Sequence, residues 1–339
     1  MLAAYTDLKN AQKVKNFILK KDLLNHDYLP VKELEHIFFP LTKKTKIPNA
    51  EVVDTKFNFP QKERPQTIDF LLKDKLTKTE LDLIPRSQEI VGNIMILEVP
   101  PELKNKEKLI AEAYLKINRN ITTVVKKQEM HKGVYRTRKV KILAGKNNKE
   151  TVHHENGVEI KLHLEKTYFS ARSGNERLRI SRLVKPNEEI LVMFSGAAPY
   201  PLVIAKNSPA KIVYGIELNP LAHQFALENV TLNKLEKKVI ILLGDVRKIA
   251  PTIKKKFNRV VMPLPKTGEE FLDVSLEKAK KGAFIHLYAF LDEKEIDDYA
   301  KKVKMICKKG GHPVRILKKV KCGQFSPGTF RVCFDLKLI

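Results

Sequence analysis

The carboxyl-terminal half of the chain is predicted to be an α/β domain with a mostly parallel sheet, preceded by smaller units. From Thr167 onward, short apolar segments alternate with amphipathic ones. This alternation indicates parallel strands buried between two layers of helices. The last two apolar segments leave no room for a helix between them, so they are predicted to form an antiparallel hairpin at the sheet edge.

Five apolar segments are the candidate parallel strands of this domain, and two more form the hairpin. Each is rich in Val, Ile and Leu, as buried strands are. The parallel candidates span residues 189–194, 211–217, 238–243, 259–264 and 283–289. The hairpin combines residues 314–321 and 329–339. Together these segments predict one mixed seven-stranded sheet.

Residues 66–165 are predicted to form an α+β unit. Residues 90–100 (IVGNIMILEVP) are apolar and β-branched and end at prolines, which predicts a strand, and residues 106–118 have a helical pattern. Further predicted strands cover residues 121–127, 140–145 and 158–166, the last with the alternation of a half-exposed strand.

Residues 1–60 are predicted to be a small separate unit that contains an amphipathic helix. Five apolar residues recur at helical spacing and define one buried face. They are Leu8, Ala11, Val14, Phe17 and Ile18. The proline-flanked stretch 59–65 (FPQKERP) is a predicted linker. The predicted domains are therefore residues 1–60, 66–165 and 166–339.

The charge balance predicts a polyanionic partner. The chain has 64 Lys and Arg against 39 Asp and Glu, a net charge of +25 that is spread along its length. A folded, strongly basic protein most often binds nucleic acid. A Lys-rich proteome or a thermophile's charged surface is the alternative, although thermophile surfaces usually balance Lys with Glu.

Cysteine usage and hydropathy argue against several protein classes. Cys307, Cys322 and Cys333 form no CxxC pair, so neither a zinc site nor a disulfide framework is indicated. The first residues lack the apolar core of a secretory signal, and no apolar run approaches membrane-spanning length. We expect a soluble, cytoplasmic protein with no membrane contact.

A turn of small residues follows the first strand of the α/β domain, FSGAAPYP (194–201). Such a turn between a strand and a helix lets the backbone approach a ligand closely. This turn has fewer glycines than a typical glycine-rich loop, because Gly196 is followed by Ala197 and Ala198. Taken alone, this turn is weak evidence for a cofactor.

Acidic residues follow the next two strands. Glu217 lies 21 residues after Gly196, about where nucleotide-binding folds place the acid that accepts from ribose hydroxyls. The alternative is that Glu217 is an ordinary carboxylate at a strand end. The functional interpretation is favoured because a helix start follows directly: Asn219 can cap the next helix, and Pro220 suits its first position. Asp245, past the third strand, can accept from an adenine amino group.

The remaining turn and the absence of a phosphate motif narrow the cofactor class. Pro263 and Pro265 stiffen the turn after the fourth strand. The sequence carries no phosphate-binding pattern, so a nucleoside-type cofactor without pyrophosphate suits a loop with so few glycines.

Several segments match a known family in the right order. In the α/β domain they are FSGAAPYPLVIAK, YGIELNPLAHQFALENVTLNK, VIILLGDVRKI and RVVMPLPKTGEEFLD, and upstream they are residues 85–103, 133–145 and 166–180. The chain resembles the archaeal and eukaryotic tRNA guanosine-37 N1-methyltransferase family over roughly residues 85–339. Residues 1–60 resemble that family's small amino-terminal domain.

The resemblance implies a class I (Rossmann-like) methyltransferase domain with a mixed seven-stranded sheet, S-adenosyl-L-methionine as cofactor and tRNA as partner. It implies methyl transfer to N1 of guanosine 37, beside the anticodon. The amino-terminal domain would check the tRNA body, and the other two domains would hold the anticodon stem-loop.

Two catalytic roles also follow from the resemblance. Guanine N1 carries a proton at neutral pH, so its methylation needs a base and stabilisation of the charge that forms on O6. The family's base matches Glu176 in NERLRI, and its O6 cation matches Arg136 in VYRTR. Without the resemblance, Glu176 would pass as a surface carboxylate paired with Arg177 or Arg179, and Arg136 as a phosphate contact.

The resemblance implies a larger set of cofactor contacts, and the target base is expected to be flipped out of its loop. The contacts are Tyr168, Arg172, Phe194, Ser195, Gly196, Glu217, Leu218, Asp245, Val246 and Pro263. Tyr168 can line the cofactor pocket, stack on a base or pack in the core. Arg172 can contact the cofactor carboxylate or an RNA phosphate.

The sequence departs from the family pattern at two places. Pro263 stands where many members have Asn, which argues against an exocyclic amine as target but also removes a possible hydrogen bond to the guanine. Ala197 and Ala198 stand where members often carry more glycine, and we expect them to crowd the cofactor.

The sequence also allows two other functions. One is a wyosine-pathway enzyme on the same nucleotide, by aminocarboxypropyl transfer or a second methylation. Glu176 favours methyl transfer over aminocarboxypropyl transfer. The other is a non-catalytic tRNA-binding protein on a decayed methyltransferase fold, against which intact Glu217, Asp245, Glu176 and Arg136 argue. Nothing suggests an obligate dimer, so we expect a monomer.

Overall fold

The computed structural model describes residues 1–61, 67–128 and 133–339. The chain divides into two compact units, Met1–Leu71 and Leu72–Ile339. Residues 62–65 of the predicted linker lie outside the described residues. No helix within the described residues combines the length and apolar character needed to cross a membrane.

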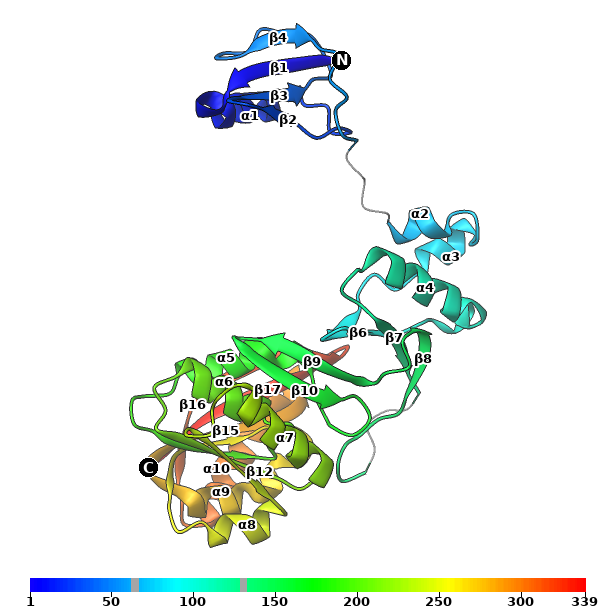
Figure 1. The fold of residues 1–339 in the computed structure, drawn as a ribbon. Coiled ribbons are helices and arrows are strands. Elements are labelled where there is room, and N and C mark those ends of the chain that lie inside the picture. Colours follow the sequence, from blue (N-terminus) through cyan, green and yellow to red (C-terminus); the bar gives the residue numbers. More distant parts are fainter. Residues whose placement is uncertain (62–66, 129–132) are drawn as a thin grey trace. The chain divides into compact units, whose positions relative to one another are not determined.

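The first unit is an antiparallel sheet with the order β2-β3-β1-β4 and one helix packed on it (Figure 1). Its strands are β1 (Leu2–Asp7), β2 (Val31–Glu33), β3 (His36–Pro40) and β4 (Glu51–Asp54). The predicted helix forms, but its first turn is the 3-10 helix η1 (Leu8–Asn10), where Leu8 is exposed. Helix α1 (Ala11–Lys20) follows and buries Val14 and Ile18.

The second unit begins with short helices and a four-stranded sheet of order β5-β6-β7-β8. The helices are α2 (Ile68–Leu72), which spans the division between the units, α3 (Lys78–Asp82), the 3-10 helix η2 (Pro101–Lys106) and α4 (Glu107–Ile117). The strands are β5 (Glu89–Val91), β6 (Ile94–Leu97), β7 (Thr123–Lys127) and β8 (Val140–Gly145).

The single strand predicted for residues 90–100 is wrong, because two short antiparallel strands occupy this stretch. Gly92 and Asn93 join β5 to β6, and Gly92 has a φ of 55°. A Cβ at Gly92 would lie 2.1 Å from Thr151 Oγ1, so the turn needs glycine. The continuous apolar character of the segment hid a two-residue turn.

The strand predicted at 158–166 forms half of a hairpin. β10 (Val158–His163) pairs antiparallel with β9 (Glu150–Glu155). Two asparagine side chains, one in α7 (Pro220–Leu232) and one directly after it, bind the backbone of β10: Lys161 N donates to Asn229 Oδ1 at 2.7 Å, and Glu159 N donates to Asn233 Oδ1 at 2.8 Å. The hairpin is thereby fastened to a helix of the α/β sheet.

The largest sheet has the order β13-β12-β11-β14-β15-β17-β16. Its strands are β11 (Glu189–Met193), β12 (Ile212–Glu217), β13 (Val239–Leu243), β14 (Phe257–Met262), β15 (Ala279–Asp292), β16 (Val314–Ser326) and β17 (Thr329–Leu338). Strands β11 to β15 pair in parallel, and β17 runs antiparallel to both of its neighbours. The predicted mixed seven-stranded sheet with an antiparallel edge hairpin is confirmed.

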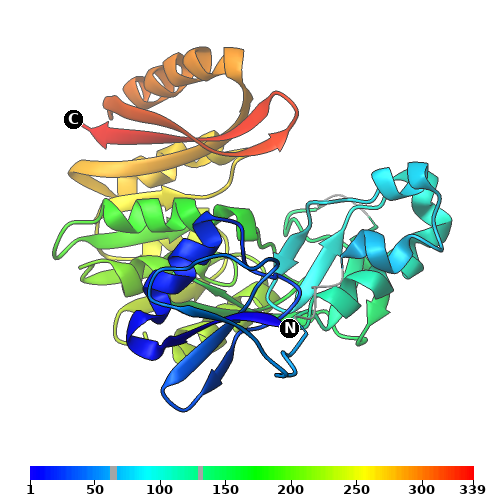
Figure 2. The ribbon, with the colours of Figure 1, turned by 90° about the horizontal axis from the view of Figure 1, so that it is seen from above.

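Helices cover both faces of this sheet. Ile190 and Val192 of β11 join one buried cluster, and Leu191 and Met193 join the other, as the two-residue period of a strand requires. The first cluster includes residues of α5 (Gly174–Arg182), α6 (Pro199–Asn207) and α7 (Pro220–Leu232). The second includes residues of α8 (Val246–Thr252), α9 (Leu272–Lys278) and α10 (Ile296–Lys309), and Figure 2 shows α10 beside the final hairpin.

Three 3-10 helices complete the unit. They are η3 (Ala171–Ser173), η4 (Gly268–Phe271) and η5 (Glu293–Glu295). The segment that contains η3 leads from the β9–β10 hairpin into α5, and it supplies several of the side chains described below.

Candidate active site

Three cavities share lining residues near the carboxyl ends of β11, β12 and β14. We name each after one lining residue: the Glu217 cavity of about 480 Å³, the Tyr288 cavity of about 60 Å³ and the Phe325 cavity of about 640 Å³. Tyr168 lines all three. Ligands of open α/β sheets bind at this edge, so the cavities are the candidate site.

The loop after β11 has an unusual backbone. Phe194, Gly196 and Ala198 have φ values of 61°, 57° and 68°, which lie in the left-handed region. Non-glycine residues rarely adopt this region, and such residues gather at ligand sites where the surrounding structure holds them. Phe194 is held by an edge-on contact with Phe271, with ring centroids 4.9 Å apart.

The expectation that Ala197 and Ala198 crowd the cofactor is wrong. Both are fully buried and belong to the apolar cluster beneath α6 and α7, and neither lines any of the three cavities. The left-handed turn points their methyl groups into the core. Only Gly196 of the three small residues faces the cavities.

Glu217, at the end of β12, binds the backbone of the loop that follows β11. Its Oε2 accepts from Gly196 N at 2.6 Å, and its Oε1 accepts from Asn219 N at 2.8 Å. Burial raises the pKa of Glu217 above its ordinary value, although these backbone hydrogen bonds act in the opposite direction. A carboxylate offers about four acceptor positions, more than these backbone groups use, so it can still accept from a ligand hydroxyl.

The predicted helix start after Glu217 is present. Asn219 Oδ1 accepts from Leu221 N at 3.0 Å, and Pro220 occupies the first turn of α7. The cap fixes the direction in which the chain leaves β12 and so positions the Glu217 carboxylate at the cavity wall.

The Glu217 cavity brings together most of the cofactor contacts expected from the sequence. It is lined by Tyr168, Phe194, Gly196, Glu217, Leu218 and Pro263. Asp245 and Val246 do not line it. Asp245 caps α8 by accepting from Arg247 N at 2.8 Å, and Val246 is buried in the core.

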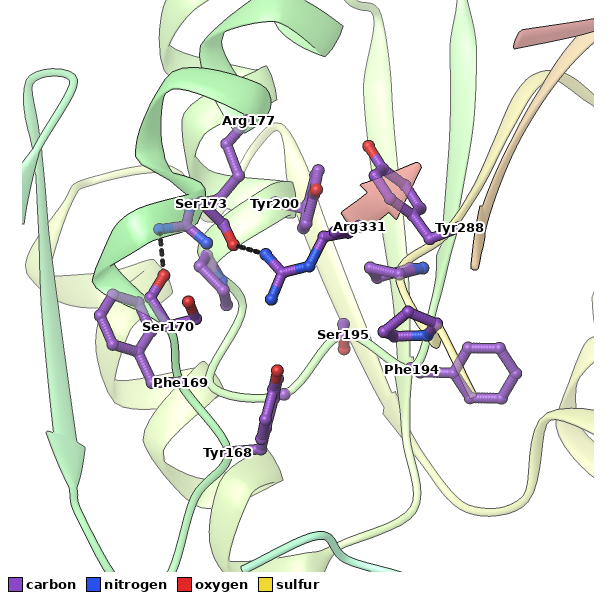
Figure 3. A pocket seen from close by; sticks show the side chains of 14 residues that line it. Tyr168, Phe169, Ser170, Ser173, Arg177, Phe194, Ser195, Tyr200, Tyr288 and Arg331 are labelled. Atoms are coloured by element: carbon purple, nitrogen blue, oxygen red, sulfur yellow. Dashed lines mark hydrogen bonds between the residues drawn. The ribbon is translucent and has the colours of Figure 1, made fainter. Parts of the chain in front are cut away.

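The Tyr288 cavity lies beside it and is shown in Figure 3. Ser195, which was expected at the cofactor, lines this cavity. Arg177 also lines it but is tied by a buried ion pair to Glu155. Arg331 extends into the middle of the view, and its Nη1 donates to Ser173 Oγ.

The Phe325 cavity has a basic and aromatic lining. Its cations are Lys127, Arg136, Arg138, Arg172, Lys266 and Arg331, against Glu89 and Glu98. Phe325 is half-exposed and stacks on Phe290, with centroids 4.1 Å apart and planes 30° apart. Arg172 lines this cavity and neither of the other two, so of the other expected cofactor contacts it shares a cavity only with Tyr168.

Arg136 stands where two cavities meet. It lines both the Glu217 and the Phe325 cavities, and its guanidinium carbon lies 4.8 Å from the centroid of the Tyr168 ring. Burial lowers the pKa of Arg136, and the positive charge of Arg331 acts in the same direction. Two cations therefore approach one another beside Tyr168, an arrangement that an electron-rich ligand would stabilise.

Glu176 lies near these cavities but lines none of them. It is 4% exposed, and its carboxylate accepts from Arg179 at 2.7 and 2.8 Å and from the Tyr288 hydroxyl at 2.7 Å. Tyr288 lines the Tyr288 cavity, so its hydrogen bond to Glu176 links the carboxylate to that cavity. The pairing with Arg179 matches the alternative raised from the sequence, except that the pair is not on the surface.

A chain of buried charges continues from Glu176 across the sheet. Arg179 also donates to Asp335 at 2.7 Å, and His286 Nδ1 lies 2.7 Å from the other Asp335 oxygen. Burial would raise the pKa of Asp335, but hydrogen bonds from His286 and Arg179 hold it well below its ordinary value. Beyond His286, Arg259 Nη1 lies 2.7 Å from the second ring nitrogen.

The sequence did not indicate several residues of the site, among them Tyr288, Phe290, Phe325 and Arg331. These four come from β15, β16 and β17, which the sequence marked only as apolar strands. β17 also carries Asp335 and Lys337, so a charged residue in this strand was no local sign of a role for Arg331. Its partner Ser173 is 158 residues away in the chain, a distance that no motif spans.

Comparison with known proteins decides the family. The TRM5/TYW2 methyltransferase domain matches residues 151–317, and the TYW2 N-terminal domain matches residues 68–148. The tRNA (guanine(37)-N(1))-methyltransferase Trm5b of Pyrococcus abyssi is 31% identical over 99% of this chain and 99% of its own length. The chain belongs to the TRM5/TYW2 methyltransferase family.

Other members of the TRM5/TYW2 family are similarly close. The tRNA(Phe) (4-demethylwyosine(37)-C(7)) aminocarboxypropyltransferase of Pyrococcus horikoshii is 31% identical over 79% of this chain and 95% of its own length. The solved complex of aTrm5 and tRNALeu aligns over 100% of both chains, with a TM-score of 0.78 and 29% identity. The family resemblance and the Rossmann-like fold expected from the sequence are thereby confirmed, whereas the division into domains 1–60, 66–165 and 166–339 stays a prediction.

Proposed function

We propose that this protein transfers a methyl group from S-adenosylmethionine to N1 of guanosine 37 in tRNA. The observation that carries the proposal is the set of joined cavities, with Glu217 at one end, Arg136 beside Tyr168 at the junction, and a basic, aromatic cavity beyond. The Pyrococcus abyssi relative that aligns along nearly the whole chain is named for this reaction, which supports the proposal.

The Glu217 cavity fits the nucleoside of the cofactor. The Glu217 carboxylate is free to accept from ribose hydroxyls, and Phe194, Leu218 and Pro263 offer apolar walls for a base. Gly196 lines both the Tyr288 and the Glu217 cavities, and because it has no side chain the backbone can approach a ligand there. When bound, S-adenosylmethionine supplies an electrophilic methyl carbon.

Arg136 and Tyr168 are the proposed contacts of the target base. Arg136 lines the cavities on both sides of Tyr168, so its guanidinium can reach a base that enters from the Phe325 cavity. We assign it to O6, where negative charge forms when N1 loses its proton. A guanidinium keeps its charge and has fixed donor directions, which suits that role.

Glu176 is the proposed base, and Tyr288 the proposed relay. The Tyr288 hydroxyl donates to Glu176, and Tyr288 lines the cavity, so this hydroxyl offers a route for the N1 proton to Glu176. Burial raises the pKa of Tyr288 well above its ordinary value, so the phenol stays neutral and acts as a relay rather than as a base. Its hydroxyl passes one proton to Glu176 as it accepts the proton from N1.

The partner in this proposal is tRNA, bound by a cytoplasmic monomer. The net charge of +25 and the six cations of the Phe325 cavity favour a polyanion. The half-exposed Phe325 offers a face on which a nucleobase can stack.

The experiment uses unmodified tRNA transcripts with guanosine or adenosine at position 37 and labelled S-adenosylmethionine. Mass spectrometry of the digested tRNA should find N1-methylguanosine with the guanosine transcript and no product with the adenosine transcript. Saturable tRNA binding without any methylated nucleoside would contradict the proposal and favour the decayed, non-catalytic alternative.

A second candidate is aminocarboxypropyl transfer to a wyosine precursor at the same position. The match of residues 68–148 to the TYW2 N-terminal domain favours it. The two reactions leave different products from the cofactor: methyl transfer leaves S-adenosylhomocysteine, and aminocarboxypropyl transfer leaves 5′-methylthioadenosine. Chromatography of the spent cofactor therefore separates them.

A further inference from the structure

Arg331 has a buried hydrogen-bond donor that has no role in the proposed methyl transfer. It reaches the Tyr288 cavity from β17, and Figure 3 shows its guanidinium between Ser173, Tyr168 and Ser195. Its Nη1 donates to Ser173 Oγ, but its Nε is buried and has no hydrogen-bond partner among the described residues. A buried donor without a partner is costly, so this one points to a ligand.

The charge around Arg331 indicates the sign of that ligand. The other cation of the cavity, Arg177, is 2% exposed and paired with Glu155, whereas Arg331 pairs with no carboxylate of a described residue. No acidic side chain within the described residues lines the cavity. An anionic group would therefore satisfy both the unpaired charge and the buried donor.

The geometry of the guanidinium indicates the shape of the ligand. With Nη1 engaged by Ser173, the edge formed by Nε and Nη2 stays available. Two parallel N–H groups on one edge match the two oxygens of a carboxylate.

The position of the cavity indicates which carboxylate. The Tyr288 and Glu217 cavities share Tyr168, Phe194, Gly196 and Pro263 as lining residues. A ligand whose ribose reaches Glu217 therefore extends past Gly196 toward Arg331. In S-adenosylmethionine the methionine arm leaves the ribose end and carries a carboxylate.

We propose that Arg331 binds the methionine carboxylate of S-adenosylmethionine. The inference rests on the proposed function, because it takes S-adenosylmethionine as the cofactor. It replaces Arg172, which the sequence suggested for this contact but which lines only the Phe325 cavity. The carboxyl-terminal hairpin thereby takes part in cofactor binding.

The test compares two ligands that differ only in the carboxylate: S-adenosylmethionine and decarboxylated S-adenosylmethionine. Their dissociation constants are measured by calorimetry on the full chain without tRNA, so no turnover is needed. Wild type should bind S-adenosylmethionine roughly 10- to 100-fold more tightly, the range expected for hydrogen bonds to a charged group. In Arg331→Gln, this preference should shrink to about threefold or less, because the charge and the paired donors are lost.

Two further variants keep the test interpretable. Arg331→Lys keeps the charge without the paired donors and should have an intermediate preference. Arg315→Gln changes an exposed arginine of β16 in the same hairpin that lines none of the three cavities, so it should keep the wild-type preference. Thermal unfolding of each variant verifies that it is folded.

The outcomes separate the inference from the proposed function. If wild type does not bind S-adenosylmethionine saturably, the proposed function fails. If wild type binds it and Arg331→Gln keeps the full preference, the inference is overturned and the function stands. Loss of the preference in Arg172→Gln instead, or a change confined to tRNA binding in Arg331→Gln, would also overturn the inference.

Discussion

Glu176→Gln removes one buried negative charge with almost no change in side-chain volume. In the native protein the carboxylate accepts two hydrogen bonds from Arg179 and one from Tyr288. The glutamine has one acceptor oxygen, and its NH₂ group would meet an Arg179 donor. A hydrogen bond to a charged group contributes about 1.5–3 kcal/mol, and Arg179 keeps Asp335. We therefore expect the free energy of unfolding to fall by about 2 kcal/mol.

The effect of Glu176→Gln on the reaction should be much larger than its effect on binding. If Glu176 is the base, single-turnover methylation of a guanosine-37 transcript should slow by at least about 100-fold, the low end of general-base effects. Dissociation constants for S-adenosylmethionine and tRNA should stay within about threefold of wild type, because Glu176 lines none of the cavities. Rapid-quench kinetics, calorimetry and urea unfolding measure the three quantities on the same preparations.

Asp335→Asn is the matched control for this prediction. It removes the other partner of Arg179 but leaves the Glu176 carboxylate in place. We expect it to destabilise the fold by about 3 kcal/mol, as loss of one partner of a buried pair does, and to keep turnover within about tenfold of wild type. A Glu176→Gln rate within threefold of wild type, or equal losses of turnover in the two variants, would refute the assignment of the base.

Four further predictions address the relay, the charge network, the cofactor site and the partner. Tyr288→Phe should lower turnover by at least about tenfold with unchanged cofactor affinity, measured by the same kinetics, because it breaks the proposed proton path. Asp335 has a depressed pKa in the folded state, so its stabilisation is present above the ordinary Asp pKa of about 3.9 and is lost as pH falls through the folded value. Urea unfolding should accordingly give a full difference between wild type and Asp335→Asn at neutral pH and a shrinking difference at more acidic pH. Glu217→Ala should weaken S-adenosylmethionine binding by at least about tenfold in calorimetry, because the mutation removes a ribose acceptor and the acceptors of two backbone N–H groups. The tRNA association constant should fall steeply with salt in filter binding, because a chain with a charge of +25 releases counterions when it binds.

Each of these predictions has an outcome that contradicts it. Normal turnover in Tyr288→Phe would show that the proton leaves by another route. A stability difference for Asp335→Asn that stays constant into acid would remove Asp335 from the titrating network. Unchanged cofactor affinity in Glu217→Ala would assign the ribose to other residues, and salt-independent tRNA binding would speak against phosphate contacts.

Local pattern was sufficient for the elements of the α/β domain. The apolar runs of β11 to β15 and the missing helix before β17 follow from side-chain periodicity, which acts over a few residues. The Asn219 cap and the Gly196 turn are local for the same reason. The strand expected over residues 90–100 failed because apolar continuity masked the turn at Gly92, whose need for glycine comes from Thr151 on another strand.

The sequence by itself determined the fold class, the family and the acidic residue at the end of β12, because each depends on residues close together in the chain. Only the tertiary structure decided that Glu176 is buried behind Tyr288, that Arg179 bridges to Asp335 156 residues away, and that Arg331 rather than Arg172 enters the Tyr288 cavity. These contacts join segments that meet only when the parallel strands and the final hairpin assemble into one sheet. Side-chain burial and pairing at such junctions depend on the whole topology, which no local spacing encodes.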